Sequence, residues 1–213
     1  MIAVLLSITA LIAYTMGSLR TDIIASRFFL HKNLQAYSRD NLGITRFLND
    51  FGRMGVVIVV LTEALKTVIP VLLGGLLLSI RGQGDMGRAF ALFCVMMGTT
   101  FPVLYGFKGE HSLIAMCAGL ICVNFSVGVL AAAMFIGMYF LTRYISLAAL
   151  ISALFTLMVT IILLEGDWVH RLLLGCIVIV FIEYRKNIVR LIRKKEPKFI
   201  YRKDLSYIFD ESV

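Results

Sequence analysis

Residues 113–141 read LIAMCAGLICVNFSVGVLAAAMFIGMYFL, and this uncharged apolar run decides how many helices the chain sends through a membrane. A helix that spans the hydrocarbon core needs about 20 residues, so the run is long for one span and short for two. Its middle holds Asn124, with Gly119 and Gly128 on either side. We therefore predict that the run divides near Asn124 into two short helices, both at least partly surrounded by protein.

The composition of the whole chain is that of a membrane protein. Of its 213 residues, 60% are hydrophobic and 16% are charged, and the mean hydropathy is +0.90. A soluble domain has about half apolar and a quarter charged residues. These values exclude a disordered chain and an ordinary soluble globule. They predict an all-α integral membrane protein with a single membrane domain over 1–213.

Five further apolar runs lie outside 113–141. They predict helices near 2–19, 54–80, 89–106, 144–164 and 168–184. The first run, from Met1 to Tyr14, has neither a charged start nor a small-residue cleavage site, so we interpret it as a first span and not as a signal peptide.

The basic residues predict the orientation, because Lys and Arg crowd the cytoplasmic loops of membrane proteins. Segment 20–53 holds six of them and the tail 185–213 holds nine; Lys108 and Arg143 complete 17 of the 21. Only an odd number of spans places these segments on one side. We predict seven transmembrane helices, with the N-terminus outside and the C-terminus cytoplasmic. This orientation explains the net charge of +8, so the charge does not indicate a nucleic-acid partner.

Two segments fall outside a plain bundle. Segment 20–53 carries the apolar residues Ile23, Ile24, Phe28, Phe29 and Leu30, which predict an amphipathic piece between spans 1 and 2 that lies on the membrane. The basic cytoplasmic tail 185–213 is either a surface helix on anionic lipid or a solvated end.

The residues that commonly bind metals or react form no cluster in the sequence. Cys94, Cys117, Cys122 and Cys176 each lie inside an apolar run, without Cys or His neighbours at metal-ligand spacing. We interpret them as small buried hydrophobic residues, and we predict no metal and no cofactor.

Glu63 and Lys66 lie three positions apart within 54–80, so they share one face of a helix. Ionisable groups at membrane depth are costly and usually paired. The pair is either part of a functional site or a structural ion pair. Pro70, four residues further on, predicts a kink in the same helix.

The polar clusters all fall on the predicted cytoplasmic side. They are SRDNLGITR (38–46), GTTFPVLYGFKGEH (98–111), RYISL (143–147) and the stretch 185–190 with Asn187. Backbone N–H groups, hydroxyls and cations of this kind bind phosphate. For 38–46 alone, a simple cytoplasmic loop is the favoured interpretation. Together the clusters indicate a protein that brings a phosphorylated ligand from the cytoplasm to a lipid-soluble partner. A small-solute transporter is the weaker interpretation.

Six short motifs follow one another along the chain in a familiar order. They are GSLR (17–20), SRDNLGITRFLN (38–49), EALKT (63–67), GTTFPVLYGFKGEHS (98–112), RYISLAA (143–149) and RKNIVRL (185–191). With similar spacing they resemble the family motifs G-S-I-P-x-G, G-S-G-N-x-G-A-T-N-x-x-R, D-x-x-K-G, G-H-x-F-P-V-x-x-x-F-K-G-G-K-G, R-Y-x-S-L-A-S and R-E-N-I-x-R-L. These motifs belong to the bacterial acyl-phosphate:glycerol-3-phosphate acyltransferases of the PlsY type.

The resemblance implies a seven-span protein of the bacterial inner membrane that acts in phospholipid synthesis. The family transfers a fatty acyl chain from acyl phosphate to the 1-hydroxyl of glycerol 3-phosphate and makes lysophosphatidic acid, with neither a metal nor a cofactor. Its partners here would be acyl phosphate, glycerol 3-phosphate and membrane lipid.

The resemblance also implies a set of site residues. The catalytic candidates are Lys108, His111, Ser146 and Thr45. The substrate-binding candidates are Arg39, Asn41, Gly43, Arg46, Gly109 and Asn187. Of these, Arg39, Thr45, Lys108 and Ser146 are expected around the acyl phosphate, and His111, Asn187 and Arg46 around the acceptor.

Several family positions hold other residues in this chain. Arg39 replaces a serine, Asn49 an arginine, Glu110 a glycine, His111 a lysine, and Thr99 and Tyr184 replace histidines. Each lost charged contact to phosphate removes about 1.5–3 kcal/mol, so we predict turnover on the family's substrates at least ~100-fold below that of an intact site. The alternative is a catalytically silent paralogue that binds lipid or a membrane partner.

Overall fold

The computed structural model describes residues 2–21, 44–107, 109 and 112–193. For residues 44–56 and 104 it describes the backbone and not the side chain. These residues form helices joined by short turns and contain no strand. The helices are α1 (Ile2–Gly17), α3 (Ile44–Ser79), α4 (Gly84–Thr100), the 3₁₀ turn η2 (Val103–Tyr105), α5 (Leu113–Val123), α6 (Phe125–Thr142), α7 (Ile145–Leu163), α8 (Asp167–Glu183) and α9 (Arg185–Ile192).

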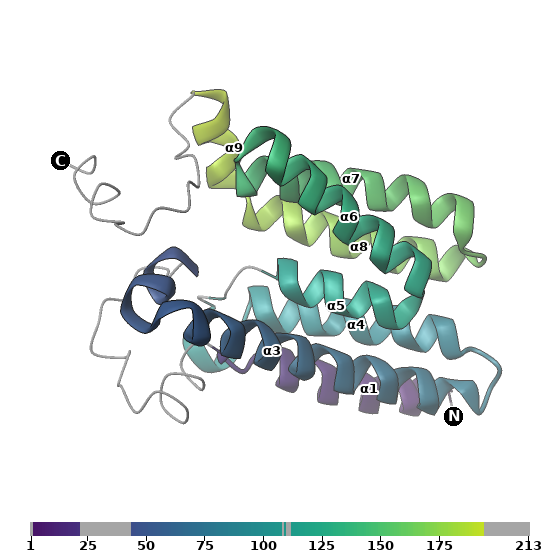
Figure 1. Cartoon of the computed structure of the whole chain (residues 1–213). Helices are drawn as coiled ribbons and strands as arrows, with labels where there is room; N and C mark the ends of the chain where they lie inside the picture. The colour runs from purple at the N-terminus through teal and green to yellow at the C-terminus, as the bar shows by residue number, and fades with distance from the viewer. Residues whose placement is uncertain (1, 22–43, 108, 110–111, 194–213) are drawn as a thin grey trace.

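Helix α4 lies at the centre of the bundle. It packs against α1, α3, α5 and α8, while α6 packs against α5 and α7. Figure 1 shows the long helices side by side and running in alternate directions, so that the start of α1 and the end of α8 lie at opposite ends of the bundle. The short helix α9 lies at the same end as the close of α8.

Close helix crossings depend on glycine. A Cβ atom on Gly87 of α4 would lie 2.3 Å from the carbonyl oxygen of Gly74 in α3, and one on Gly98 would lie 2.4 Å from the carbonyl oxygen of Tyr14 in α1. Small residues let helix backbones approach in membrane proteins, where packing replaces the hydrophobic effect as the driving force between helices.

The helix break in 113–141 falls at Asn124, as the sequence indicates. Helix α5 ends at Val123 and α6 begins at Phe125, with Asn124 extended between them. The side-chain oxygen of Asn124 accepts a hydrogen bond of 3.2 Å from the backbone N–H of Val127, which makes it the N-cap of α6. Helix α5 buries five of its residues, whereas α6 buries three, at the end next to the break.

Two helices differ from the sequence prediction. The helix expected over 89–106 is α4, which spans Gly84–Thr100 and so lies about one turn earlier in the chain. We expected the second helix near residue 54, but α3 already begins at Ile44 and continues through Pro70 to Ser79. Residues 44–53 therefore extend this helix and are not part of a separate segment between spans. The other expected part of that segment, 22–43, and the tail residues 194–213 lie outside the described residues.

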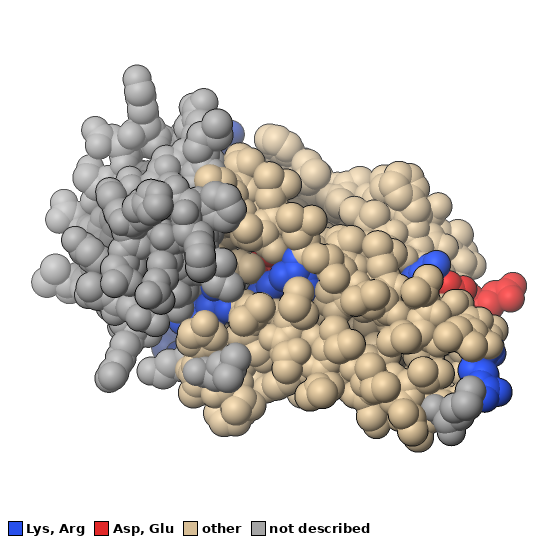
Figure 2. All heavy atoms as spheres, turned by 90° about the horizontal axis from the view of Figure 1, so that it is seen from below, with Lys and Arg blue, Asp and Glu red and all other residues tan. Residues whose placement is uncertain are grey.

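Three of the described helices are long and apolar enough to cross a bilayer by length and composition. They are the Val57–Ser79 part of α3, α6 and α7, while α1 and α5 are apolar but shorter. Large apolar side chains such as Leu65, Leu76, Met158 and Ile162 are exposed along these helices. Figure 2 shows red and blue atoms at the right-hand end of the visible face, a few more blue atoms near its middle and beside the grey atoms, and tan atoms over the rest. This surface is that of a membrane protein.

The four cysteines lie within the helices, as expected. Cys94 and Cys176 are buried, Cys117 and Cys122 are partly buried, and all four are free thiols.

Candidate functional site

The predicted site residues that the structure describes lie at one end of the bundle, here called the polar end. It comprises the close of α1, α4, α6 and α8 together with the start of α3, α5, α7 and α9 (Figure 1). Hydrogen bonds join these helix ends to one another, and they define the geometry of the site.

Ser146 and Asn187 are in contact at the polar end. The Asn187 side-chain Nδ2 donates a hydrogen bond of 3.1 Å to the Ser146 Oγ. Ser146 is buried near the start of α7, and Asn187 is partly buried in the first turn of α9. The structure therefore brings together two of the predicted site residues from segments that are separate in the sequence.

Gly109 occupies a place that admits no side chain. A Cβ atom there would lie 2.1 Å from the carbonyl oxygen of Thr99 and 2.4 Å from that of Thr100. Both oxygens belong to the backbone at the end of α4 and cannot move as a flexible side chain does. The close approach explains why the family-like motif has glycine at this position.

The turn before Gly109 is fastened to α1. The carbonyl oxygen of Pro102 accepts hydrogen bonds from the backbone N–H groups of Tyr105 (3.2 Å) and Phe107 (3.0 Å). The Tyr14 hydroxyl of α1 donates a hydrogen bond of 2.7 Å to the Phe101 carbonyl oxygen. Phe107 adopts a left-handed conformation with φ 59°, which is uncommon for a bulky residue.

The remaining predicted site residues are placed in part or not at all. Thr45 and Arg46 belong to the first turn of α3, but their side chains are not described. Arg39, Asn41, Gly43, Lys108 and His111 lie outside the described residues.

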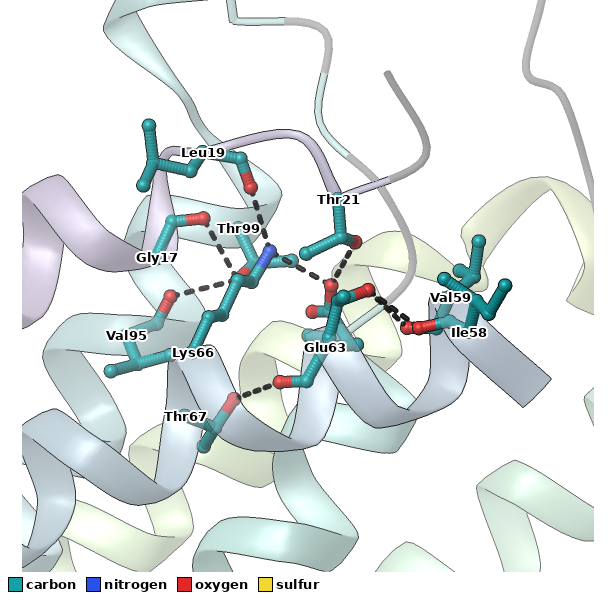
Figure 3. A network of polar contacts seen from close by, with 12 residues as sticks. Gly17, Leu19, Thr21, Ile58, Val59, Glu63, Lys66, Thr67, Val95 and Thr99 are labelled. Atoms are coloured by element: carbon teal, nitrogen blue, oxygen red, sulfur yellow. Dashed lines mark hydrogen bonds and ion pairs between the residues drawn. The ribbon is translucent and has the colours of Figure 1, made fainter. Parts of the chain in front are cut away.

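Glu63 and Lys66 form a buried ion pair with an N–O distance of 2.9 Å (Figure 3). Lys66 also donates a hydrogen bond of 2.9 Å to the carbonyl oxygen of Leu19, just after α1, and the Thr21 hydroxyl donates to Glu63. Lys66 is 6% exposed, so its ammonium group does not extend to water. The pair joins α3 to the chain that follows α1, as a structural ion pair does.

Thr99 holds the same region from α4. Its hydroxyl lies 3.0 Å from the Val95 carbonyl oxygen and 3.2 Å from that of Gly17 (Figure 3). Thr99 is 3% exposed. The residue that stands where the related motif has a histidine therefore contacts the backbone of α1 and α4.

Glu183 is a polar-end residue that the sequence reasoning missed. Its carboxylate accepts hydrogen bonds from the Thr100 hydroxyl and from the backbone N–H of Ser112, the latter at 3.2 and 3.1 Å to the two oxygens. The available signal was an acidic residue at the end of the apolar run 168–184, a position at which a carboxylate is unusual in a membrane helix.

The polar end offers hydroxyl, amide and backbone N–H groups, and it offers no metal site among the described residues. No group of three or more His, Cys, Asp or Glu side chains in that part of the chain is placed to hold a metal ion. Hydroxyl, amide and backbone N–H groups bind and orient a polar ligand by hydrogen bonds.

Comparison with known proteins points to one family. The model of the family described as glycerol-3-phosphate acyltransferase matches residues 7–194. A protein of Nitrosomonas eutropha named glycerol-3-phosphate acyltransferase is 29% identical over 186 residues, which cover 87% of this chain and 93% of the relative. A protein of Jannaschia sp. with the same name is 30% identical over 197 residues, covering 92% and 94%.

The fold agrees with that of solved structures. Crystal structures of PlsY (YgiH), an integral membrane glycerol 3-phosphate acyltransferase, superpose with a TM-score of 0.78 at 21% sequence identity. The form with glycerol 3-phosphate covers 96% of this chain and 98% of the solved chain. The form with lysophosphatidic acid covers 92% and 95%.

Proposed function

Because the chain belongs to the glycerol-3-phosphate acyltransferase family of the PlsY type, we propose that it transfers a fatty acyl chain from acyl phosphate to the 1-hydroxyl of glycerol 3-phosphate. The product is lysophosphatidic acid, and the reaction belongs to phospholipid synthesis. The observation that carries the proposal is the family match over residues 7–194, which includes all the polar-end residues described above.

The proposed topology has seven spans, with the N-terminus outside and the C-terminus in the cytoplasm. Its support is the alternation of α1 and α3–α8 in Figure 1, together with the basic segments that this arrangement places on one side. The polar end then faces the cytoplasm of a bacterium, and the protein is a multi-pass protein of its inner membrane. The site would be open to soluble glycerol 3-phosphate and to the lipid-soluble acyl donor.

The proposed reaction uses no side-chain nucleophile. The 1-hydroxyl oxygen attacks the acyl carbonyl carbon and forms the ester bond. The bond from that carbon to the phosphate oxygen breaks, inorganic phosphate leaves with the electron pair, and a substrate phosphate takes the hydroxyl proton. The protein contributes by holding the two substrates together and by stabilising the charge of the leaving phosphate.

The proposed residue roles follow the motifs. Arg39, Thr45, Lys108 and Ser146 bind the acyl phosphate, with Asn41, Gly43 and Gly109 supplying backbone contacts; His111, Asn187 and Arg46 bind glycerol 3-phosphate. The Ser146–Asn187 hydrogen bond supports this division, because it joins a residue proposed for the acyl donor to one proposed for the acceptor. Neither a metal nor a cofactor is part of the proposal.

The direct test is an assay of the purified full-length protein with palmitoyl phosphate and glycerol 3-phosphate. Phosphate release and lysophosphatidic acid are followed together, and a reaction without glycerol 3-phosphate corrects for hydrolysis. We expect acceptor-dependent release of phosphate with an equal amount of lipid product. Release that does not depend on glycerol 3-phosphate would contradict the proposal.

A second candidate function is a catalytically silent paralogue that binds lipid or a membrane partner. The observation that favours it is the use of Thr99 for helix contacts and the burial of Tyr184, which is 2% exposed. Both stand where the related motifs have histidine. A second chain with intact motifs in the same genome, together with an inactive purified protein, would favour this candidate.

A further inference from the structure

The carboxylate of Glu183 contacts the two residues that flank the segment 101–111. The Thr100 hydroxyl, at the close of α4, donates a hydrogen bond to Glu183. The Ser112 backbone N–H, just before α5, donates to both Glu183 oxygens at 3.2 and 3.1 Å. The residues that precede and follow the segment are therefore held by a single side chain from the end of α8.

We propose that Glu183 is a positioning residue that fastens both ends of segment 101–111 to α8. The segment carries Lys108, Gly109 and His111, so the consequence for catalysis rests on the proposed function. Glu183 itself is not proposed to touch substrate.

The chemistry of the contacts supports a fastening role. The Glu183 side chain has two acceptor oxygens, so a single side chain can hold the Thr100 hydroxyl and the Ser112 N–H together. It also lies at the start of α5, where the helix dipole favours negative charge. Ser112 is fully buried at 0% exposed, so its N–H group would lose its partner if the carboxylate were removed, and water could not readily replace it.

The contacts of Glu183 are separate from the packing that joins α4 to α8. Those helices also meet along apolar surface, where a Cβ atom on Gly175 would lie 2.8 Å from the Phe93 ring. Loss of the carboxylate is therefore expected to leave the helix pair together and to loosen the segment at its ends.

The position of the Gly109 backbone depends on the position of the end of α4. Gly109 lies against the carbonyl oxygens of Thr99 and Thr100 with no room for a side chain. Because Thr100 is one of the two residues that Glu183 holds, a shift of Thr100 moves the surface on which Gly109, the neighbour of Lys108, rests.

The test compares full-length variants in lipid nanodiscs. Glu183→Gln keeps the size of the side chain and removes its charge. Thr100→Val removes one donor, and Thr100→Ser keeps that donor. Thr156→Val is the matched control, because the buried Thr156 hydroxyl donates to the Ser152 carbonyl oxygen of its own helix, at 2.7 Å. The measurements are amide hydrogen exchange, thermal unfolding, and kcat and KM for glycerol 3-phosphate.

We expect exchange in peptides covering 101–112 to become about tenfold faster in Glu183→Gln and Thr100→Val, which corresponds to about 1.4 kcal/mol. Exchange in the middle of α4 and α8 should match that of Thr156→Val. We expect kcat/KM to fall about tenfold at an unfolding temperature close to that of the control, with Thr100→Ser near wild type.

The inference would be overturned if amide hydrogen exchange in 101–112 were as slow in both Glu183→Gln and Thr100→Val as it is in the Thr156→Val control. Faster exchange with unchanged kcat and KM would overturn the role in positioning for catalysis. If Glu183→Gln does not fold, Thr100→Val decides. If the wild-type protein shows no acyl transfer, the proposed function fails, and the exchange measurement still decides whether Glu183 fastens the segment.

Discussion

The Asn187 side-chain amide donates a hydrogen bond of 3.1 Å to the Ser146 hydroxyl across 41 positions of sequence. The contact joins the first turns of α7 and α9 at the polar end. Both residues belong to motifs that we propose bind the substrates, and the hydrogen bond brings these two motifs into contact.

A double-mutant cycle on this pair should show coupling. We expect Ser146→Ala and Asn187→Ala each to lower kcat/KM for glycerol 3-phosphate, and the double variant to lose less than the two effects added. A neutral hydrogen bond contributes about 1 kcal/mol, so the coupling should be about fivefold. Ser152→Ala is the matched control, because the buried Ser152 hydroxyl bonds to Ala149 of its own helix. Additive effects would contradict a shared site.

The Glu63–Lys66 ion pair should stabilise the fold without taking part in turnover. Lys66→Met leaves a buried carboxylate without its cation, which typically costs 3–5 kcal/mol of unfolding free energy. The double variant Glu63→Leu with Lys66→Met should regain most of that loss. Thermal unfolding measures both.

The control for this pair is Arg171→Met, since the Arg171–Asp167 pair is exposed, at 63% and 87%. We expect its effect to stay below about 1 kcal/mol. A Lys66→Met variant with wild-type stability and lost turnover would show that the pair belongs to the functional site instead.

Gly109→Ala should impair catalysis more than stability. A Cβ atom there would lie 2.1 Å from the Thr99 carbonyl oxygen, so the backbone beside Lys108 must shift. A displacement of about 1 Å in a site can lower the rate about 100-fold. Steady-state kinetics compared with Gly137→Ala provide the check, because a Cβ atom on Gly137 meets nothing within 4 Å. Equal kinetics in the two variants would contradict the placement.

Reporter fusions test the topology. We expect a cytoplasmic signal from a fusion after Val213 and an extracytoplasmic signal from one near Arg81, at the turn between α3 and α4. The physical reason is that basic residues are retained on the cytoplasmic side. Cytoplasmic signals at both points would exclude the seven-span arrangement.

Turnover on the family's substrates should be slow. Replacement of the loop serine and arginine, of the second lysine and of the histidines removes phosphate contacts, and we expect a rate at least ~100-fold below that of an intact site. Complementation of a strain that lacks its own enzyme measures the outcome in cells. Full rescue at native expression would show that Arg39, Arg46 and His111 have rebuilt the site.

The sequence alone determined the class of protein, the family and most helix boundaries. The run 2–19 became α1 (Ile2–Gly17), 168–184 became α8 (Asp167–Glu183), and the division of 113–141 fell at Asn124. These features depend on local properties: the length of an apolar run, and a side chain that caps a helix start. The start of α3 at Ile44 escaped prediction, because the polar residues before 54 do not interrupt a helix and no apolar pattern marks its beginning.

Only the tertiary structure decided which polar groups meet. The spacing of Glu63 and Lys66 placed them on one helix face, but whether the ammonium group extends to water or to the Leu19 carbonyl depends on where the chain after α1 passes. The role of Glu183 was likewise hidden, because Thr100 and Ser112 lie 83 and 71 positions away from it in the chain. Contacts between helix ends are set by the packing of whole helices against one another, and no short stretch of sequence contains that information.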